Sequence, residues 1–109
     1  MSREKVLVLA GDGIGPEIMK EAIKVLDIVS KKYSISFDLK DAPVGGASID
    51  CYGVPLTEEV LTDALKSRCV LLGAVGEPKW EGLDYSIRPE RALLRLRKEL
   101  GLFANLRPA

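Results

Sequence analysis

An unbroken apolar run, Val6–Ala10, lies near the start of the chain and is followed at once by a glycine-rich turn, Gly11–Gly15, and by Pro16. A short run of branched residues bounded by glycine is typical of a strand buried on both faces, which favours a parallel sheet. Pro16 suits the first position of a helix. Apolar residues then recur at helical spacing and predict a helix that packs on the sheet to about residue 31 through Ile18, Ala22, Val25, Leu26 and Val29.

The rest of the chain continues the alternation of strands and helices. Residues 34–40 alternate apolar and polar side chains, 69–75 form a second apolar run, and 102–106 predict a further strand. Residues 43–50 are expected to form a loop, because glycines are paired there. Helices are expected after Thr57, as N-cap, and from residue 89 to about 100. The apolar stripe of the helix after Thr57 is predicted at Val60, Leu61, Ala64 and Leu65.

This order predicts an α/β fold, with a partial, mostly parallel sheet and flanking helices. Because the chain finishes on an apolar strand without neighbours, residues 1–109 are expected to be a single incomplete domain.

Charge and residue content exclude several kinds of function. Sixteen basic residues balance sixteen acidic ones, so no net field attracts nucleic acid or an anionic membrane. There is no histidine, and Cys51 and Cys69 have no partners at metal-ligand spacing, which excludes a Cys/His zinc site and a histidine triad. No run approaches the ~20 apolar residues that span a bilayer, and no signal peptide is recognised. We therefore expect a cytoplasmic protein that binds neither membrane nor nucleic acid.

The glycine turn does not match the dinucleotide fingerprint. That fingerprint requires a third glycine where helix and strand approach closely, and here the turn has Gly15 at the wrong spacing and then Pro16. Taken alone, the turn is interpreted as a tight connection between strand and helix, although the helix N-terminus is suited to an anion.

A second motif, Gly73–Trp80, follows a buried strand at the edge where open α/β sheets bind ligands. Its glycines allow close backbone approach, and Lys79 and Trp80 supply a cation and a flat surface. The alternative is an ordinary loop with Trp80 folded onto the core.

A third motif lies on the late helix. Glu90, Leu93 and Arg97 share one face, because residues three or four apart on a helix are neighbours. Arg107 follows the predicted last strand, and we expect it to meet Arg97 over one pocket, where two guanidinium groups suit carboxylates. The alternative is a solvated arginine-rich face, to which Arg91 and Arg95 are assigned.

Together the segments 11–17, 73–80 and 102–108 resemble the β-decarboxylating dehydrogenase family, and within it the branch that acts on 3-isopropylmalate. The resemblance covers essentially the whole chain but only the leading part of a family member. It implies the N-terminal portion of a discontinuous first domain. It also implies NAD-dependent oxidative decarboxylation of 3-isopropylmalate to 2-oxoisocaproate in leucine biosynthesis, with this fragment inactive alone.

The resemblance assigns residues to the site. Arg97 and Arg107 would hold the carboxylates of the substrate, and Leu93 and Leu94 would contact its isopropyl branch. Leucines there disfavour a substrate with a further carboxylate, which would be costly to desolvate. The residues implied in NAD binding are Ile14, Gly76, Glu77, Pro78, Lys79, Trp80, Arg88, Pro89 and Glu90. Glu77 stands where family members commonly have glycine.

The resemblance also implies Mg²⁺ or Mn²⁺, with the metal ligands and the catalytic residues beyond Ala109. Family members are homodimers, and a complementary C-terminal piece is a possible partner. Two alternatives stay open: a sister dehydrogenase acting on homoisocitrate or a tartrate-like acid, and a catalytically silent interaction module.

Overall fold

The computed structural model describes residues 3–109, and at its centre lies a three-stranded parallel sheet. The strand β1 (Arg3–Gly11) lies between β2 (Ser36–Asp41) and β3 (Cys69–Ala74). Val6 is paired with Leu39 on one side and with Cys69 on the other. The predicted α/β class and parallel sheet are therefore confirmed.

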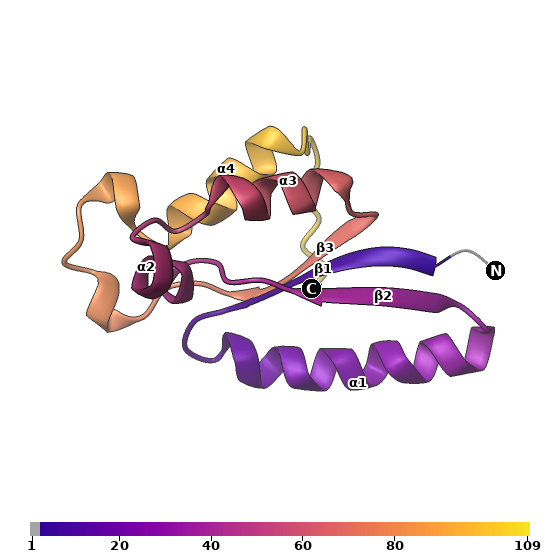
Figure 1. Cartoon of the computed structure of the whole chain (residues 1–109). Helices are drawn as coiled ribbons and strands as arrows, with labels where there is room; N and C mark the ends of the chain where they lie inside the picture. The colour runs from indigo at the N-terminus through magenta and orange to yellow at the C-terminus, as the bar shows by residue number, and fades with distance from the viewer. Residues whose placement is uncertain (1–2) are drawn as a thin grey trace.

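Helices cover the two faces of the sheet (Figure 1). The long helix α1 (Gly15–Tyr33) lies on one face, and α3 (Glu58–Lys66) and α4 (Glu90–Glu99) lie on the other. The short helix α2 (Gly46–Tyr52) lies beyond the carboxyl ends of the strands. Two short 3-10 helices, Pro78–Trp80 and Tyr85–Ile87, separate β3 from α4. None of these helices, within residues 3–109, is long and apolar enough to cross a membrane.

The side chains of β1 divide the interior into two cores, because successive residues of a strand point to opposite faces. Val6 and Val8 pack with Met19 of α1. Leu7 and Leu9 belong to a larger cluster with α3 and α4. The buried members contributed to that cluster from outside β1 are Val44, Leu56, Val60, Leu61, Ala64, Ala92 and Leu96.

The buried face of α1 is only partly the predicted one, since Leu26 and Val29 are half-buried but the other three residues are not. Ile18, Ala22 and Val25 are exposed, and Met19 and Ile23 contact the sheet instead. The reason is Gly15, the first helical residue, where a Cβ would lie only 2.1 Å from the Ala10 carbonyl oxygen. This close approach fixes the rotation of the helix and brings the face of Gly15, not that of Ile18, onto β1.

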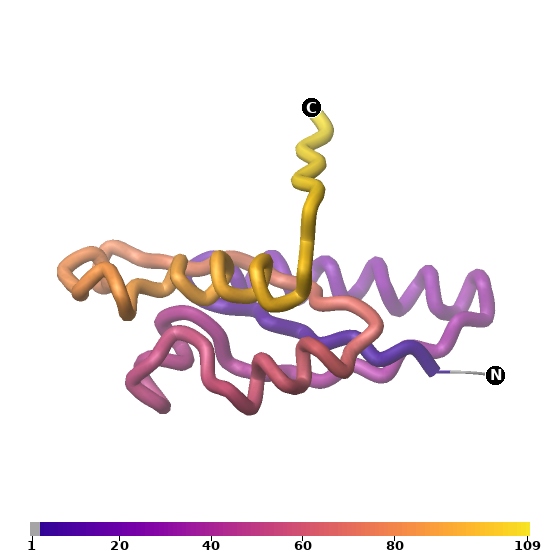
Figure 2. Tube along the Cα trace, turned by 90° about the horizontal axis from the view of Figure 1, so that it is seen from above, coloured from indigo at the N-terminus to yellow at the C-terminus, as the bar shows by residue number. Residues whose placement is uncertain are grey.

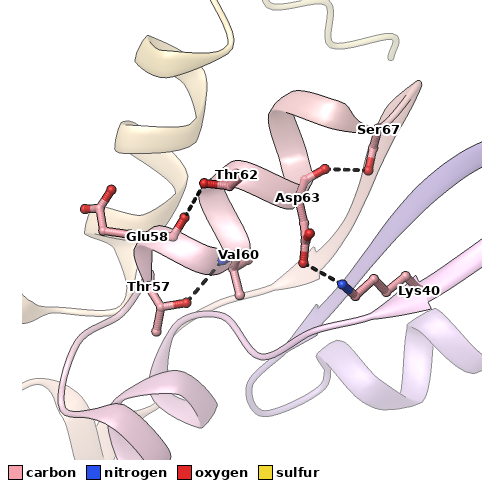
Figure 3. Close-up of polar contacts among 7 residues, drawn as sticks. All are labelled: Lys40, Thr57, Glu58, Val60, Thr62, Asp63 and Ser67. Atoms are coloured by element: carbon pink, nitrogen blue, oxygen red, sulfur yellow. Dashed lines mark hydrogen bonds and ion pairs between the residues drawn. The ribbon is translucent and has the colours of Figure 1, made fainter.

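The helix α3 begins as predicted. The Thr57 hydroxyl accepts a hydrogen bond of 3.2 Å from the Val60 amide (Figure 3). Val60, Leu61 and Ala64 are buried as expected, but Leu65 is 55% exposed, so its assignment to the buried stripe is wrong.

The expectation of a loop at 43–50 is wrong, since α2 occupies Gly46–Tyr52. Gly45 precedes it with φ +68°, and Gly53 ends it in a left-handed conformation. The first two amides of the helix donate to the carboxylate of Asp12, which lies more than thirty residues earlier in the chain. This long-range support compensates for the poor helix propensity of the local sequence.

The predicted strand at 102–106 is also absent. No strand pairs with this segment within the described residues, and Phe103 and Leu106 are 99% and 88% exposed. A strand needs a neighbour for its backbone hydrogen bonds, and after α4 the chain turns at Gly101 and leads away from the sheet (Figure 2).

Candidate functional site

Two turns meet at the carboxyl ends of β1 and β3. Gly11 of β1 is paired with Ala74 of β3, and the Asp12 amide donates to the Ala74 carbonyl oxygen at 2.7 Å. Gly11 has φ +84°, and a Cβ there would lie 1.9 Å from the same oxygen. Glycine is therefore required for the glycine turn, 11–15, to lie against the start of the segment 75–80.

The carboxylate of Asp12 holds this arrangement together from inside. It accepts hydrogen bonds from the amides of Gly46 at 2.6 Å, Ala47 at 2.7 Å and Gly76 at 3.0 Å, and Asp12 is only 5% exposed. Sequence reasoning missed Asp12 as a site residue. The available signal was an acidic residue inside an otherwise small and apolar turn.

Glu77 makes a second connection between the two turns at the surface. Its carboxylate accepts a hydrogen bond of 2.7 Å from the amide of Gly13. Ile14, the next residue, is 60% exposed at the start of α1. The side chain of Glu77 therefore connects the proposed cofactor segment to the glycine turn.

Trp80 is folded onto the core, as in the alternative given to the second motif. It is 9% exposed, and its indole lies against Gly46, where a Cβ would be 2.1 Å from Trp80 Nε1. Lys79 lies with its Nζ 4.5 Å from the centre of the same ring and 3.7 Å from a carboxylate oxygen of Asp50. The cation and the flat surface are therefore adjacent, but the ring is mostly covered.

A hollow of about 300 Å³ lies next to this segment and gathers most of the predicted cofactor-binding residues. Arg88 is held in its wall by a hydrogen bond from Nε to the Leu83 carbonyl oxygen at 3.0 Å. Ile14, Lys79 and Pro89 are not part of the lining. The lining residues are Gly76, Glu77, Pro78, Trp80, Glu81, Arg88 and Glu90.

The predicted substrate residues lie on α4 and after it. Arg97 is exposed and borders a hollow of about 240 Å³ whose other lining residues are 102–106. Arg107 is exposed and is not part of that lining, so its convergence with Arg97 stays a prediction. Leu93 is half-buried, and Leu94 lines a different hollow beside Arg91 and Arg95.

The arginines assigned to the solvated face have partners of their own. Arg95 forms an ion pair with Glu58, and Arg91 stacks on Tyr85 with its guanidinium carbon 4.9 Å from the ring centre. In residues 3–109, by contrast, no ion pair involves Arg97 or Arg107. Those two guanidinium groups are free to bind a ligand.

A metal centre is not formed by the part of the chain that the structure describes. No three side chains of His, Cys, Asp or Glu gather there as a metal ion would require.

Comparisons with known proteins agree on one family. The sequence model described as isocitrate/isopropylmalate dehydrogenase matches residues 5–109. A 3-isopropylmalate dehydrogenase of Pseudomonas fluorescens is 57% identical over 106 residues, which are 97% of this chain and 29% of that protein. A 3-isopropylmalate dehydrogenase of Campylobacter jejuni is 57% identical over 109 residues, which are 99% of this chain and 30% of that protein. The chain thus spans about 30% of the length of these relatives.

Solved structures give the same result at lower identity. A β-decarboxylating dehydrogenase of Thermococcus kodakarensis superposes with a TM-score of 0.73 at 34% identity, covering 92% of this chain and 27% of that one. An isocitrate dehydrogenase of Methylococcus capsulatus superposes with a TM-score of 0.74 at 26% identity. The match covers 91% of this chain and 26% of that one.

Proposed function

We propose a function from one premise: the chain belongs to the isocitrate/isopropylmalate dehydrogenase family. The chain is the part of an NAD-dependent 3-isopropylmalate dehydrogenase that carries one wall of the cofactor site and part of the substrate site. The whole enzyme converts 3-isopropylmalate to 2-oxoisocaproate and carbon dioxide in leucine biosynthesis. The names of the relatives at 57% identity support this branch of the family.

The observation that carries the proposal is the hollow beside Trp80. Six of the nine residues proposed for NAD binding line it, although they come from segments on both sides of the second 3-10 helix. It lies next to the carboxyl end of β3, where α/β sheets bind ligands. These residues would hold and orient NAD, which would supply the acceptor for the hydride that the substrate loses. Ile14, Lys79 and Pro89 complete the proposed set from outside the lining.

We assign the substrate carboxylates to Arg97 and Arg107. Both are exposed, and neither is ion-paired within the described residues, so binding a carboxylate breaks no internal pair. A planar guanidinium matches a carboxylate with two parallel hydrogen bonds. Leu93 and Leu94 are assigned to the isopropyl branch, because a branched alkyl group loses nothing on leaving water beside leucine, whereas a carboxylate would.

The divalent metal must obtain its ligands elsewhere. Family membership implies a metal, and Mg²⁺ or Mn²⁺ would act as a Lewis acid on the ketone formed after hydride loss. The described residues do not fit such an ion, since no three suitable ligands gather among them. We propose a cytoplasmic homodimer, with no nucleic acid or membrane as partner.

Complementation tests the proposal. The chain is mixed with a separately produced remainder of the enzyme, and formation of NADH from 3-isopropylmalate is followed by absorbance. We expect activity only in the mixture, and a loss of about 100-fold or more in Arg97→Ala, because one of the two guanidinium groups assigned to the substrate carboxylates is removed. Arg95→Ala is the matched control, since Arg95 lies on the same helix and pairs with Glu58. Activity that survives Arg97→Ala, or binding of the remainder without turnover, contradicts the assignment.

A further inference from the structure

The burial of Asp12 requires an explanation beyond local turn geometry. A carboxylate that is only 5% exposed is costly unless its oxygens are hydrogen-bonded. In the described residues Asp12 has no cation as an ion-pair partner, and its oxygens are satisfied by three backbone amides. Two of these amides belong to the start of α2 and one to the segment after β3. One side chain thus joins three stretches of the chain.

The amides that Asp12 binds are those that fix the wall of the hollow. Gly76, with φ +100°, is the residue at which the lining segment leaves β3. The Trp80 ring packs directly against Gly46, because a Cβ on Gly46 would overlap Trp80 Nε1. The fit is close, because a Cβ on Gly45 would lie 2.6 Å from Asp12 Oδ2. Asp12 therefore sets both the start of the segment 76–80 and the position of its tryptophan.

We propose that Asp12 is a positioning residue that aligns the segment 76–80 with the first turn of α2 through the amides of Gly46, Ala47 and Gly76. It acts through the backbone and takes no part in hydride or proton transfer. The consequence for NAD, a cofactor wall that is formed before the cofactor binds, rests on the proposed function.

Asp12→Asn is the decisive variant. It keeps the shape of the side chain but removes the charge and replaces one acceptor oxygen by an amino group, which cannot accept from a backbone amide. Asp12→Ala removes all three hydrogen bonds. Asp27→Asn is the matched control, because Asp27 lies on α1 with 61% of its side chain exposed and pairs only with Lys31.

Amide hydrogen exchange separates positioning from general stabilisation. In Asp12→Asn we expect exchange at Ala47 and Gly76 to accelerate about tenfold or more, while the central amides of β1 stay as in the unchanged chain. Trp80, the single tryptophan, should shift its emission to the red. Exchange that accelerates equally in β1 and in the two loops, or that does not change at Gly76, overturns the proposal.

A titration with NAD tests the link to the cofactor in the same variants, each mixed with the separately produced remainder of the enzyme. We expect Asp12→Asn to bind NAD about tenfold more weakly than Asp27→Asn. Unchanged NAD affinity in a variant whose Gly76 amide has become labile overturns the role in cofactor binding. If the unchanged chain mixed with the remainder of the enzyme binds no NAD, the proposed function fails, whereas the exchange data still decide whether Asp12 aligns the two segments.

Discussion

At Gly46 the absence of a side chain decides how closely two segments approach. The indole of Trp80 occupies the space where a Cβ would stand, 2.1 Å from Nε1. Gly46 is the first residue of α2, so helix propensity has little weight there. The contact with Trp80 is therefore what requires glycine at this position.

Gly46→Ala should displace Trp80 and lower the free energy of unfolding by about 1–3 kcal/mol, as for other overpacked interiors. Urea denaturation followed by Trp80 fluorescence measures both effects. Gly82→Ala is the control, because a Cβ there has no neighbour within 4 Å. Equal midpoints for the two variants would disprove the close contact.

Lys40 and Asp63 provide the pH-dependent contact at this scale. Lys40 Nζ of β2 donates a hydrogen bond of 2.8 Å to the carboxylate of Asp63 on α3 (Figure 3). This hydrogen bond is the larger cause, and the charge of Asp63 the next, by which the pKa of Lys40 is raised above its usual 10.5. Because the pKa is raised in the folded state, the contact stabilises the fold below 10.5 and this contribution is lost as pH rises through the folded value.

Lys40→Gln should therefore lower the urea midpoint slightly at neutral pH and leave it unchanged at strongly alkaline pH. The effect is small because Lys40 is exposed, and added salt should reduce it further. Lys20→Gln on α1 is the control. A difference that persists undiminished at alkaline pH would contradict the role of the charged amine.

Among the helices and strands, the sequence predicts those whose formation is determined by residues within or next to the element itself. The apolar runs of β1 and β3, Pro16 in the first turn of α1 and Thr57 before α3 each act within a few residues of the element that they determine. The helix α2 could not be predicted, because its first amides are satisfied by Asp12, which is distant in sequence. The same holds for the candidate site. The sequence predicted that residues of the segment 76–90 belong together, but it did not predict that Asp12 holds this segment in place.

Thr57→Ala tests the capping of α3 and should cost about 1 kcal/mol, because the Val60 amide loses its acceptor. Chemical denaturation of the variant gives this difference directly. Thr62→Ala is matched to it, since its hydroxyl donates only to the Glu58 carbonyl oxygen within the same helix. Equal costs for the two substitutions would show that the cap contributes nothing.

At the scale of the whole molecule, the described residues form an elongated body of 46 × 31 × 26 Å. The sheet and its helices occupy most of its length, and the segment after α4 projects from it (Figure 2). Apolar side chains in this segment are in water, among them Phe103 at 99% exposure. Its sequence is apolar, but it contributes little buried surface to the fold.

Phe103→Ser should therefore change the free energy of unfolding by less than about 0.5 kcal/mol, as for other exposed positions. Leu96→Ala, at a site only 4% exposed in the larger core, should cost roughly 2–5 kcal/mol. Calorimetric or urea unfolding distinguishes the two. A large loss in Phe103→Ser would mean that this segment packs against the body in solution.

The division of the interior by β1 has a consequence for how the protein tolerates change. Val6 and Val8 share neighbours with Met19, whereas Leu7 and Leu9 share theirs with Leu96, and a wall of backbone separates the two compartments. Substitutions in opposite compartments should combine additively, because they have no partner in common. Evolution or protein engineering can thus change the core between α1 and the sheet without altering the core between the sheet and the helices α3 and α4.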